Sequence, residues 1–190
     1  MKAIRFKAGL VLFLLLMIIF SVTFAATPED FAFKGLRLGD SYDTMVEKLG
    51  EPDFDTDMYI RGVQVIRYTY SADQKIYVDA KNKTVVEMFC KSKHYVGPHG
   101  VTYGATRAGL AKAFGKAEHR HLDGNIYYIY YNPAVPNEKM LIEIEPEERY
   151  LLSWTYTNLD LDDPGIIITG EEKEQEPAKK KFNYGGLPTN

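Results

Sequence analysis

The sequence lacks several features that would point to particular kinds of protein. Among its 190 residues there is one cysteine, Cys90, so no internal disulfide can form and no cysteine cluster can hold a structural zinc ion. Positive charge is not in surplus, because 23 basic side chains stand against 26 acidic ones, and this balance argues against a nucleic-acid partner. With 45% hydrophobic and 26% charged residues, the chain has the composition of a globular protein.

Catalytic signatures are also missing. The sequence contains no G-x-S-x-G nucleophile motif, no P-loop and no dinucleotide fingerprint. His119 and His121 are spaced as two metal ligands on one strand face would be, but a polar connection between a helix and a strand explains them more simply. We therefore expect no enzyme activity, no bound metal and no cofactor.

The first 25 residues have the layout of a secretory signal peptide. Three basic residues precede the apolar run 11–20, and the small residues Thr23 and Ala25 match a cleavage site after Ala25. The alternative is an uncleaved membrane anchor, because residues 8–26 carry no charge over 19 positions. We expect export to the periplasm, the cell surface or the extracellular space, with membrane attachment only through this segment if it is not cleaved.

The remainder of the chain contains an internal duplication. The glycine-containing segment 35–41 is echoed 65 residues later by 100–106, and the apolar positions that follow stay in phase. This pattern predicts two repeats, at 31–93 and 97–158. The charged residues 159–190 lack apolar periodicity and predict a disordered tail, within which three consecutive isoleucines could add an edge strand.

Each repeat predicts one short helix followed by three antiparallel strands. Ser41 and Thr106 are placed as N-caps of helices that Gly50 and Gly115 would end. Alternating β-forming residues predict strands at 63–70, 75–80 and 84–90, and again at 126–131, 140–145 and 150–156. The expected fold class is α+β, with two tandem repeats, each a short helix followed by a three-stranded antiparallel meander, and with the helices on one face of the sheet.

The motifs of the first repeat resemble a known module. Gly-Leu-x-x-Gly-x-Ser at 35–41, Leu-Gly-Glu-Pro at 49–52, and the segments 67–70 and 76–79 resemble the SmpA/BamE module of outer-membrane assembly factors. A tandem pair of such units resembles the β-lactamase-inhibitor-protein-like superfamily. The resemblance implies a small α+β module of the bacterial cell envelope that binds proteins and has no catalytic centre.

Alternation along the strands predicts two different faces of the sheet. One face would pack against the helices, and the other would carry more aromatic and apolar side chains than soluble monomers usually expose. The alternation also places Val85 and Leu151 on this open face, and Val86 and Leu152 on the helix face. The residues that we expect to bind a partner are Arg67, Tyr77, Phe89, Tyr127, Ile129 and Tyr131.

This surface predicts non-catalytic binding of an envelope protein or peptide. An inhibitor of an exported enzyme would use the same surface, and a structural protein would use it to self-associate. The face could also be covered by the tail or by the other repeat, or could bind a small ligand. The oligomeric state stays open at this point.

Overall fold

The computed structural model describes residues 25–122, 124–147, 149–161 and 166–167. The predicted signal peptide therefore lies outside the described residues, apart from Ala25, and so does most of the tail predicted at 159–190. Within the described part of the chain, no helix combines the length and the apolar character needed to span a membrane.

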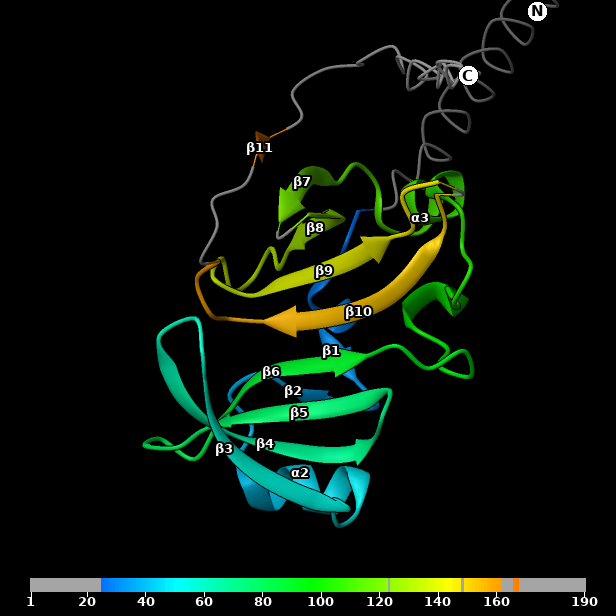
Figure 1. Ribbon diagram of the computed structural model, residues 1–190. Helices are drawn as coiled ribbons and strands as arrows, with labels where there is room; N and C mark the ends of the chain where they lie inside the picture. Colours follow the sequence, from blue (N-terminus) through cyan, green and yellow to red (C-terminus); the bar gives the residue numbers. More distant parts are fainter. Residues whose placement is uncertain (1–24, 123, 148, 162–165, 168–190) are drawn as a thin grey trace, which may run out of the picture.

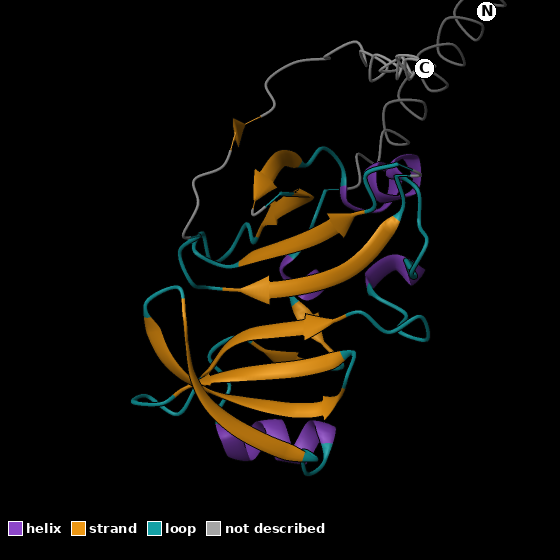
Figure 2. Ribbon diagram, viewed as in Figure 1, coloured by secondary structure: helices purple, strands orange, loops and turns teal. Residues whose placement is uncertain are grey.

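Most of the described chain forms one large antiparallel sheet (Figures 1 and 2). Its strands are β3 (Phe54–Ile60), β4 (Val63–Ser71), β5 (Gln74–Asp79), β6 (Val85–Cys90), β7 (Glu118–Leu122), β8 (Asn125–Tyr131), β9 (Lys139–Ile144), β10 (Leu151–Thr157) and β11 (Ile166–Ile167). They lie in the order β11-β7-β8-β9-β10-β6-β5-β4-β3. The first half of the protein (residues 31–93) thus meets the second half (97–158) where β6 pairs with β10.

The helices begin and end at the residues that the sequence provides for those positions. At the start of α2 (Tyr42–Leu49), Ser41 Oγ accepts a hydrogen bond from Thr44 N, and Thr106 Oγ1 does the same for α3 (Arg107–Phe114). Gly50 and Gly115 follow the two helices with φ of 82° and 78°. Shorter elements precede each helix: η1 (Pro28–Asp30), the β1–β2 pair (Ala32–Phe33 with Leu36–Arg37) and η2 (Pro98–Gly100).

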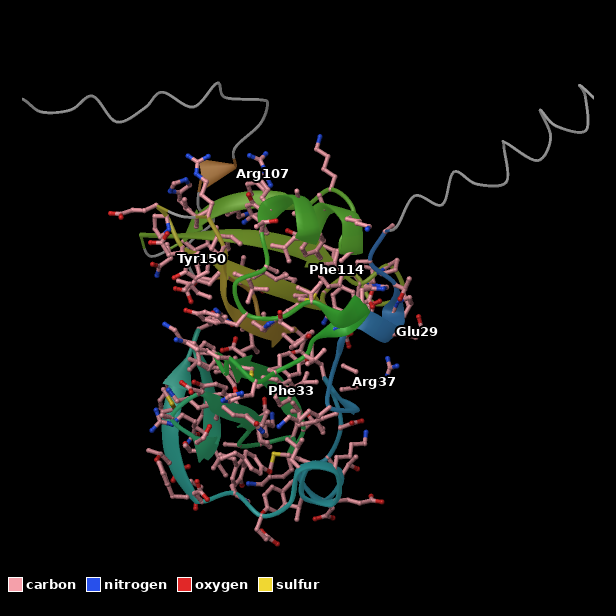
Figure 3. All side chains as sticks on the ribbon, turned by 90° about the vertical axis from the view of Figure 1, so that its right-hand side faces the viewer. Glu29, Phe33, Arg37, Arg107, Phe114 and Tyr150 are labelled. Carbon is pink, nitrogen blue, oxygen red and sulfur yellow. The ribbon has the colours of Figure 1, made fainter. Side chains whose placement is uncertain are left out.

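One hydrophobic core unites the two halves. The helices contribute Met45, Leu110 and Phe114, which pack with buried residues of both halves of the sheet. Trp154 on β10 lies at the centre of this core, where its ring meets those of Tyr95 and Phe114 edge-on, with centroids 5.8 and 6.1 Å away. Phe114 and Phe33, another residue of this core, are labelled in Figure 3. Because the core is shared, neither half buries its apolar side chains alone.

The predicted fold class is wrong. Each half has a fourth strand, β3 in the first and β7 in the second, so the described chain is mostly sheet and does not consist of two units of a helix with three strands. These two strands lie toward the ends of the large sheet and carry charged residues, with sequences FDTDMYI and EHRHL. A strand near a sheet edge is solvated more widely, so its sequence loses the apolar alternation that reveals inner strands.

Two β-bulges overturn the predicted faces at the starts of β6 and β10. The register shifts so that Val86 is an extra residue against β5, and Leu152 is an extra residue against β9. Each extra residue reverses the alternation for the residue before it. Val85 and Leu151 therefore lie in the shared core, while Val86 packs in a separate cluster with Val65.

A buried pair of tyrosines makes the core sensitive to alkaline pH. The hydroxyls of Tyr95 and Tyr156 lie 3.3 Å apart and share a hydrogen bond. Burial raises the pKa of Tyr95 to about 12, and it raises the pKa of Tyr156 well above the ordinary value for tyrosine. The cause is that a phenolate at either position would lose its hydration without gaining a cationic partner.

We expect the contribution of this pair to the free energy of unfolding to be constant up to about pH 10 and to fall as the pH rises further. Above that pH the unfolded chain has released both phenolic protons while the folded chain still holds them, so rising pH favours unfolding. Urea unfolding between about pH 8 and pH 12 measures the decline. A variant with phenylalanine at both positions should show a flatter curve, and an equally steep decline in that variant would assign the effect to other groups.

Candidate functional site

The six residues predicted to bind a partner all lie on the face of the sheet that points away from α2 and α3, here called the open face. Residues opposite each other in antiparallel strands share a face. The pairs that connect the six are Arg67 with Tyr77, Tyr77 with Glu87, Phe89 with Thr155, Thr155 with Leu141, and Leu141 with Ile129. Tyr127 and Tyr131 lie two residues either side of Ile129. In Figure 1 the open face is turned toward the viewer, with β1 and β2 behind the sheet.

The part of the open face in the second half is covered by the chain itself. After β10, Leu161 packs against the buried side chains of Ile129 and Leu141, and Leu159 packs with Val65 and Val86 of the first half in a second cluster. Lys139 Nζ donates to the carbonyl oxygen of Leu159 at 3.1 Å and holds this crossing in place. Ile129 is only 1% exposed, so it is not available for direct contact with a partner.

The two remaining predicted residues of the second half lie at the margin of this covered area. Tyr127 is partly buried against the same cluster. Tyr131 is 39% exposed, and its hydroxyl donates to Glu118 Oε2 at 3.0 Å. β10 and β9 separate these tyrosines from the predicted residues on β4, β5 and β6. The structure therefore brings Arg67, Tyr77 and Phe89 together and holds the other three apart from them.

An ion pair crosses the middle of the open face. Arg61, in the turn between β3 and β4, donates from Nη1 to the carboxylate of Glu87 on β6, and the same nitrogen lies 3.4 Å from Thr157 Oγ1 on β10. Glu87 is 8% exposed. Burial raises the pKa of the neighbouring Tyr77, and the Glu87 carboxylate raises it further, while Arg67 and Arg61 act in the opposite direction. The pair ties the β3–β4 hairpin to the junction of the two halves.

A patch of aromatic and basic side chains remains on the open face of the first half. We call it the aromatic–basic patch, and its residues are Phe54, Arg67, Thr69, Lys75, Tyr77 and Phe89. Phe54 is 56% exposed, and Lys75 Nζ lies 5.5 Å from the centroid of the Phe89 ring. Thr69 lies opposite both Phe54 and Lys75 in its two neighbouring strands. Side chains from four strands thus meet on one surface.

Three residues of this patch were not predicted from the sequence. Phe54 belongs to β3, a strand that the sequence pattern did not reveal. Thr69 and Lys75 lie in predicted strands, and their alternation with Arg67 and Tyr77 is the signal that could have placed them on the same face. The prediction of partner-binding residues favoured aromatic side chains, so it left out this threonine and this lysine.

A second feature is a hollow of about 710 Å³ at the junction of the two halves, lined by the N-terminal segment, the β4–β5 turn and residues 94–99. Inside it, His99 Nε2 lies 3.0 Å from the carboxylate of Asp30, which is 4% exposed. Cys90 also lines the hollow, but it is 2% exposed and burial raises the pKa of its thiol, so the nucleophilic thiolate is disfavoured. The His99–Asp30 contact joins the N-terminal segment to η2, at the start of the second half.

The histidines considered as metal ligands lie on β7. The His119 ring stacks on Tyr128, with centroids 4.1 Å apart and planes 19° from parallel. Its pKa is lowered first by burial and then by the charges of Arg107 and Lys116. Among the residues that the structure describes, no group of three or more histidine, cysteine, aspartate or glutamate side chains is arranged to hold a metal ion.

Comparison with known proteins gives no sequence relative. No family model matches the chain, and no curated protein matches it either. Solved structures with partial likeness include an extracellular protein containing an SCP domain from Bacillus anthracis (14% identity, TM-score 0.46), a cysteine-rich secretory protein from Staphylococcus aureus (11%, 0.42) and a DUF4309 family protein from Bacillus subtilis (16%, 0.43). The matches cover 63%, 70% and 65% of this chain, and 43%, 54% and 82% of those chains.

The resemblance to the SmpA/BamE module is therefore wrong, since the solved structures that match belong to other families and no family model matches. The motif that suggested it consists mainly of glycines, a helix cap and alternating apolar residues. Such residues are required wherever a capped helix leads into an antiparallel sheet.

Proposed function

We propose that this chain is an exported protein that binds a protein or peptide partner of the cell envelope, without catalysis, through the aromatic–basic patch. The observation that carries the proposal is the exposure of this patch. Phe54 is 56% exposed and the Phe89 and Tyr77 side chains are partly exposed, whereas the corresponding part of the second half is closed by Leu161. On the first half, Leu159 covers the neighbouring cluster of Val65 and Val86, against which Tyr77 packs at the margin of the patch.

The composition of the patch supports protein binding. Aromatic side chains and arginine supply most of the energy at protein interfaces, because they bury large areas and still form hydrogen bonds at their polar ends. The patch lies on paired strands of a sheet, so this protein orders few additional residues when a partner binds. The strands under the patch pair with neighbours on both sides, apart from the edge strand β3.

A photoreactive residue at position 54 tests the proposal. With benzoylphenylalanine in place of Phe54, expressed in the exporting host, we expect ultraviolet light to attach one defined envelope protein or peptide. The matched control is the same replacement at Val135, which is 40% exposed in the connection between β8 and β9. Identical products from both positions, or no product from position 54, would contradict the proposed function.

A further inference from the structure

The aromatic–basic patch carries positive charge that the described residues do not neutralise. Arg67 and Lys75 form no ion pair with any described side chain. The acidic residues nearest to them on this face are already engaged. Glu87 pairs with Arg61, and Asp79 Oδ1 accepts hydrogen bonds from two backbone N–H groups of the following turn, at 2.8 and 2.6 Å.

Two polar atoms beside these charges lack a hydrogen-bond partner. Arg67 Nε and Thr69 Oγ1 are both buried and unpaired within the described part of the chain. Thr69 as a whole is 4% exposed. Buried polar atoms in folded proteins are nearly always paired, so an unpaired N–H and an unpaired hydroxyl at alternate positions of one strand indicate a ligand that supplies an acceptor.

A carboxylate is the group that satisfies both the charge and the unpaired atoms. It only accepts hydrogen bonds when ionised, and its two oxygens match two donors at once. Both atoms are covered in the structure, so a carboxylate entering between Arg67 and Lys75 would reach Nε and the Thr69 hydroxyl once these two partly exposed side chains turn aside. Phe54 and Phe89 flank this position, so they would contact an apolar residue beside the carboxylate.

We propose that the aromatic–basic patch recognises an extended acidic segment of the partner, in which a carboxylate side chain lies next to an apolar one. This inference rests on the proposed function and narrows it to a class of partner. Residues 26–190 carry 20 basic and 26 acidic side chains, a net charge of −6. The patch is thus a local positive surface on a negative protein, and the rest of the protein would repel an extended polyanion such as nucleic acid.

Two short fluorescein-labelled peptides test the proposal, one with glutamate alternating with apolar residues and one with glutamine in place of each glutamate. Fluorescence anisotropy with the full-length chain at low salt should show that the glutamate peptide binds at least about tenfold more tightly. Arg67→Gln and Lys75→Gln should each weaken the glutamate peptide by about tenfold and leave the glutamine peptide unchanged. Lys112→Gln, on an exposed position of α3, is the matched charge control and should leave both peptides unchanged.

Several results would overturn the inference. They are equal binding of the two peptides, no binding of the glutamate peptide, or an equal loss with Lys112→Gln. The fourth concerns a second copy of this chain, which could offer its own glutamate-rich run at 171–176. A concentration-dependent dimer in sedimentation that Arg67→Gln abolishes would make that copy the occupant.

Thr69→Val keeps the shape of the side chain without its hydroxyl. It should weaken binding of the glutamate peptide alone, whereas a general loss of folding would weaken binding of both peptides.

The two proposals fail in distinguishable ways. If position 54 attaches a defined partner and Arg67→Gln leaves that attachment unchanged, then the proposed function stands and the carboxylate inference is wrong. If the glutamate peptide binds as expected while position 54 attaches nothing in the host, then the preference for a carboxylate stands and the proposed function is wrong.

Discussion

Replacing Gly97 with alanine is expected to lower the free energy of unfolding by about 3 kcal/mol. Gly97 has φ of −77° and ψ of −175°, a conformation that any residue adopts, so backbone strain contributes nothing. An added Cβ would lie 2.8 Å from two ring carbons of Trp154, well inside the contact distance of about 3.5–4 Å between carbon atoms. Trp154 is 1% exposed and packed against Tyr95 and Phe114, so its ring has no room to move away.

The same substitution at Gly109 is the matched control. Gly109 lies inside α3, where an added Cβ meets only Thr106 Oγ1 at the ordinary distance of 3.7 Å. Because alanine forms helix better than glycine, Gly109→Ala should raise stability by about 0.5–1 kcal/mol. Urea unfolding followed by circular dichroism measures both variants. A loss smaller than about 0.5 kcal/mol for Gly97→Ala would show that the core around Trp154 can rearrange.

Replacing Arg61 with methionine is expected to lower the free energy of unfolding by about 2–3 kcal/mol. Methionine keeps the apolar length of the side chain but removes the guanidinium, and the carboxylate of the buried residue Glu87 is then left without its cationic partner. Both members of the pair keep some contact with water, with side-chain exposures of 22% and 11%, so the loss is smaller than for a fully buried pair. Urea denaturation at neutral pH measures this loss in the free energy of unfolding.

A double variant separates the ion pair from other effects of the substitution. Arg61→Met combined with Glu87→Gln removes both charges, so the penalty of an unpaired buried carboxylate disappears and part of the lost stability should return. Arg61→Lys retains a cation at the same turn and should cost less than Arg61→Met. If the double variant is as unstable as the sum of its two single variants, the two residues do not interact across the open face.

The inner strands of the sheet could be located from the sequence, and the three isoleucines also suggested the edge strand β11, whereas β3 and β7 could not be located. Residues 63–71 alternate between the core and the open face, and that alternation is the signal a sequence pattern contains. The strand β3 carries Asp55 and Asp57 on a sheet edge, where water hydrates both of its faces and selection for apolar alternation is weak. Charged residues also discourage unwanted pairing of an open edge, so the feature that hides such strands has a role of its own.

The candidate site shows the same limit at the level of single residues. Alternation was sufficient to place Arg67 and Tyr77 on one face, because β4 and β5 pair in regular register over that stretch. It failed at Val85 and Leu151, where each bulge adds one residue to a strand and inverts the faces. Nothing in a local pattern shows that Leu161 returns to cover Ile129, since that contact depends on the path of the chain after the sheet is complete.

The order of the strands has a consequence for how such a sheet can be assembled. Inside the terminal strand β11, the two halves add their strands inward in the same sequence, β7-β8-β9-β10 and β3-β4-β5-β6, and the two final strands pair antiparallel. This is the arrangement that a two-fold axis between β10 and β6 would generate. One half by itself would leave its last strand unpaired at a sheet edge, where the last strand of an identical copy could pair with it. A homodimer of a single half would then complete an equivalent sheet. Residues 94–96 are the short connection that makes such a pair one chain.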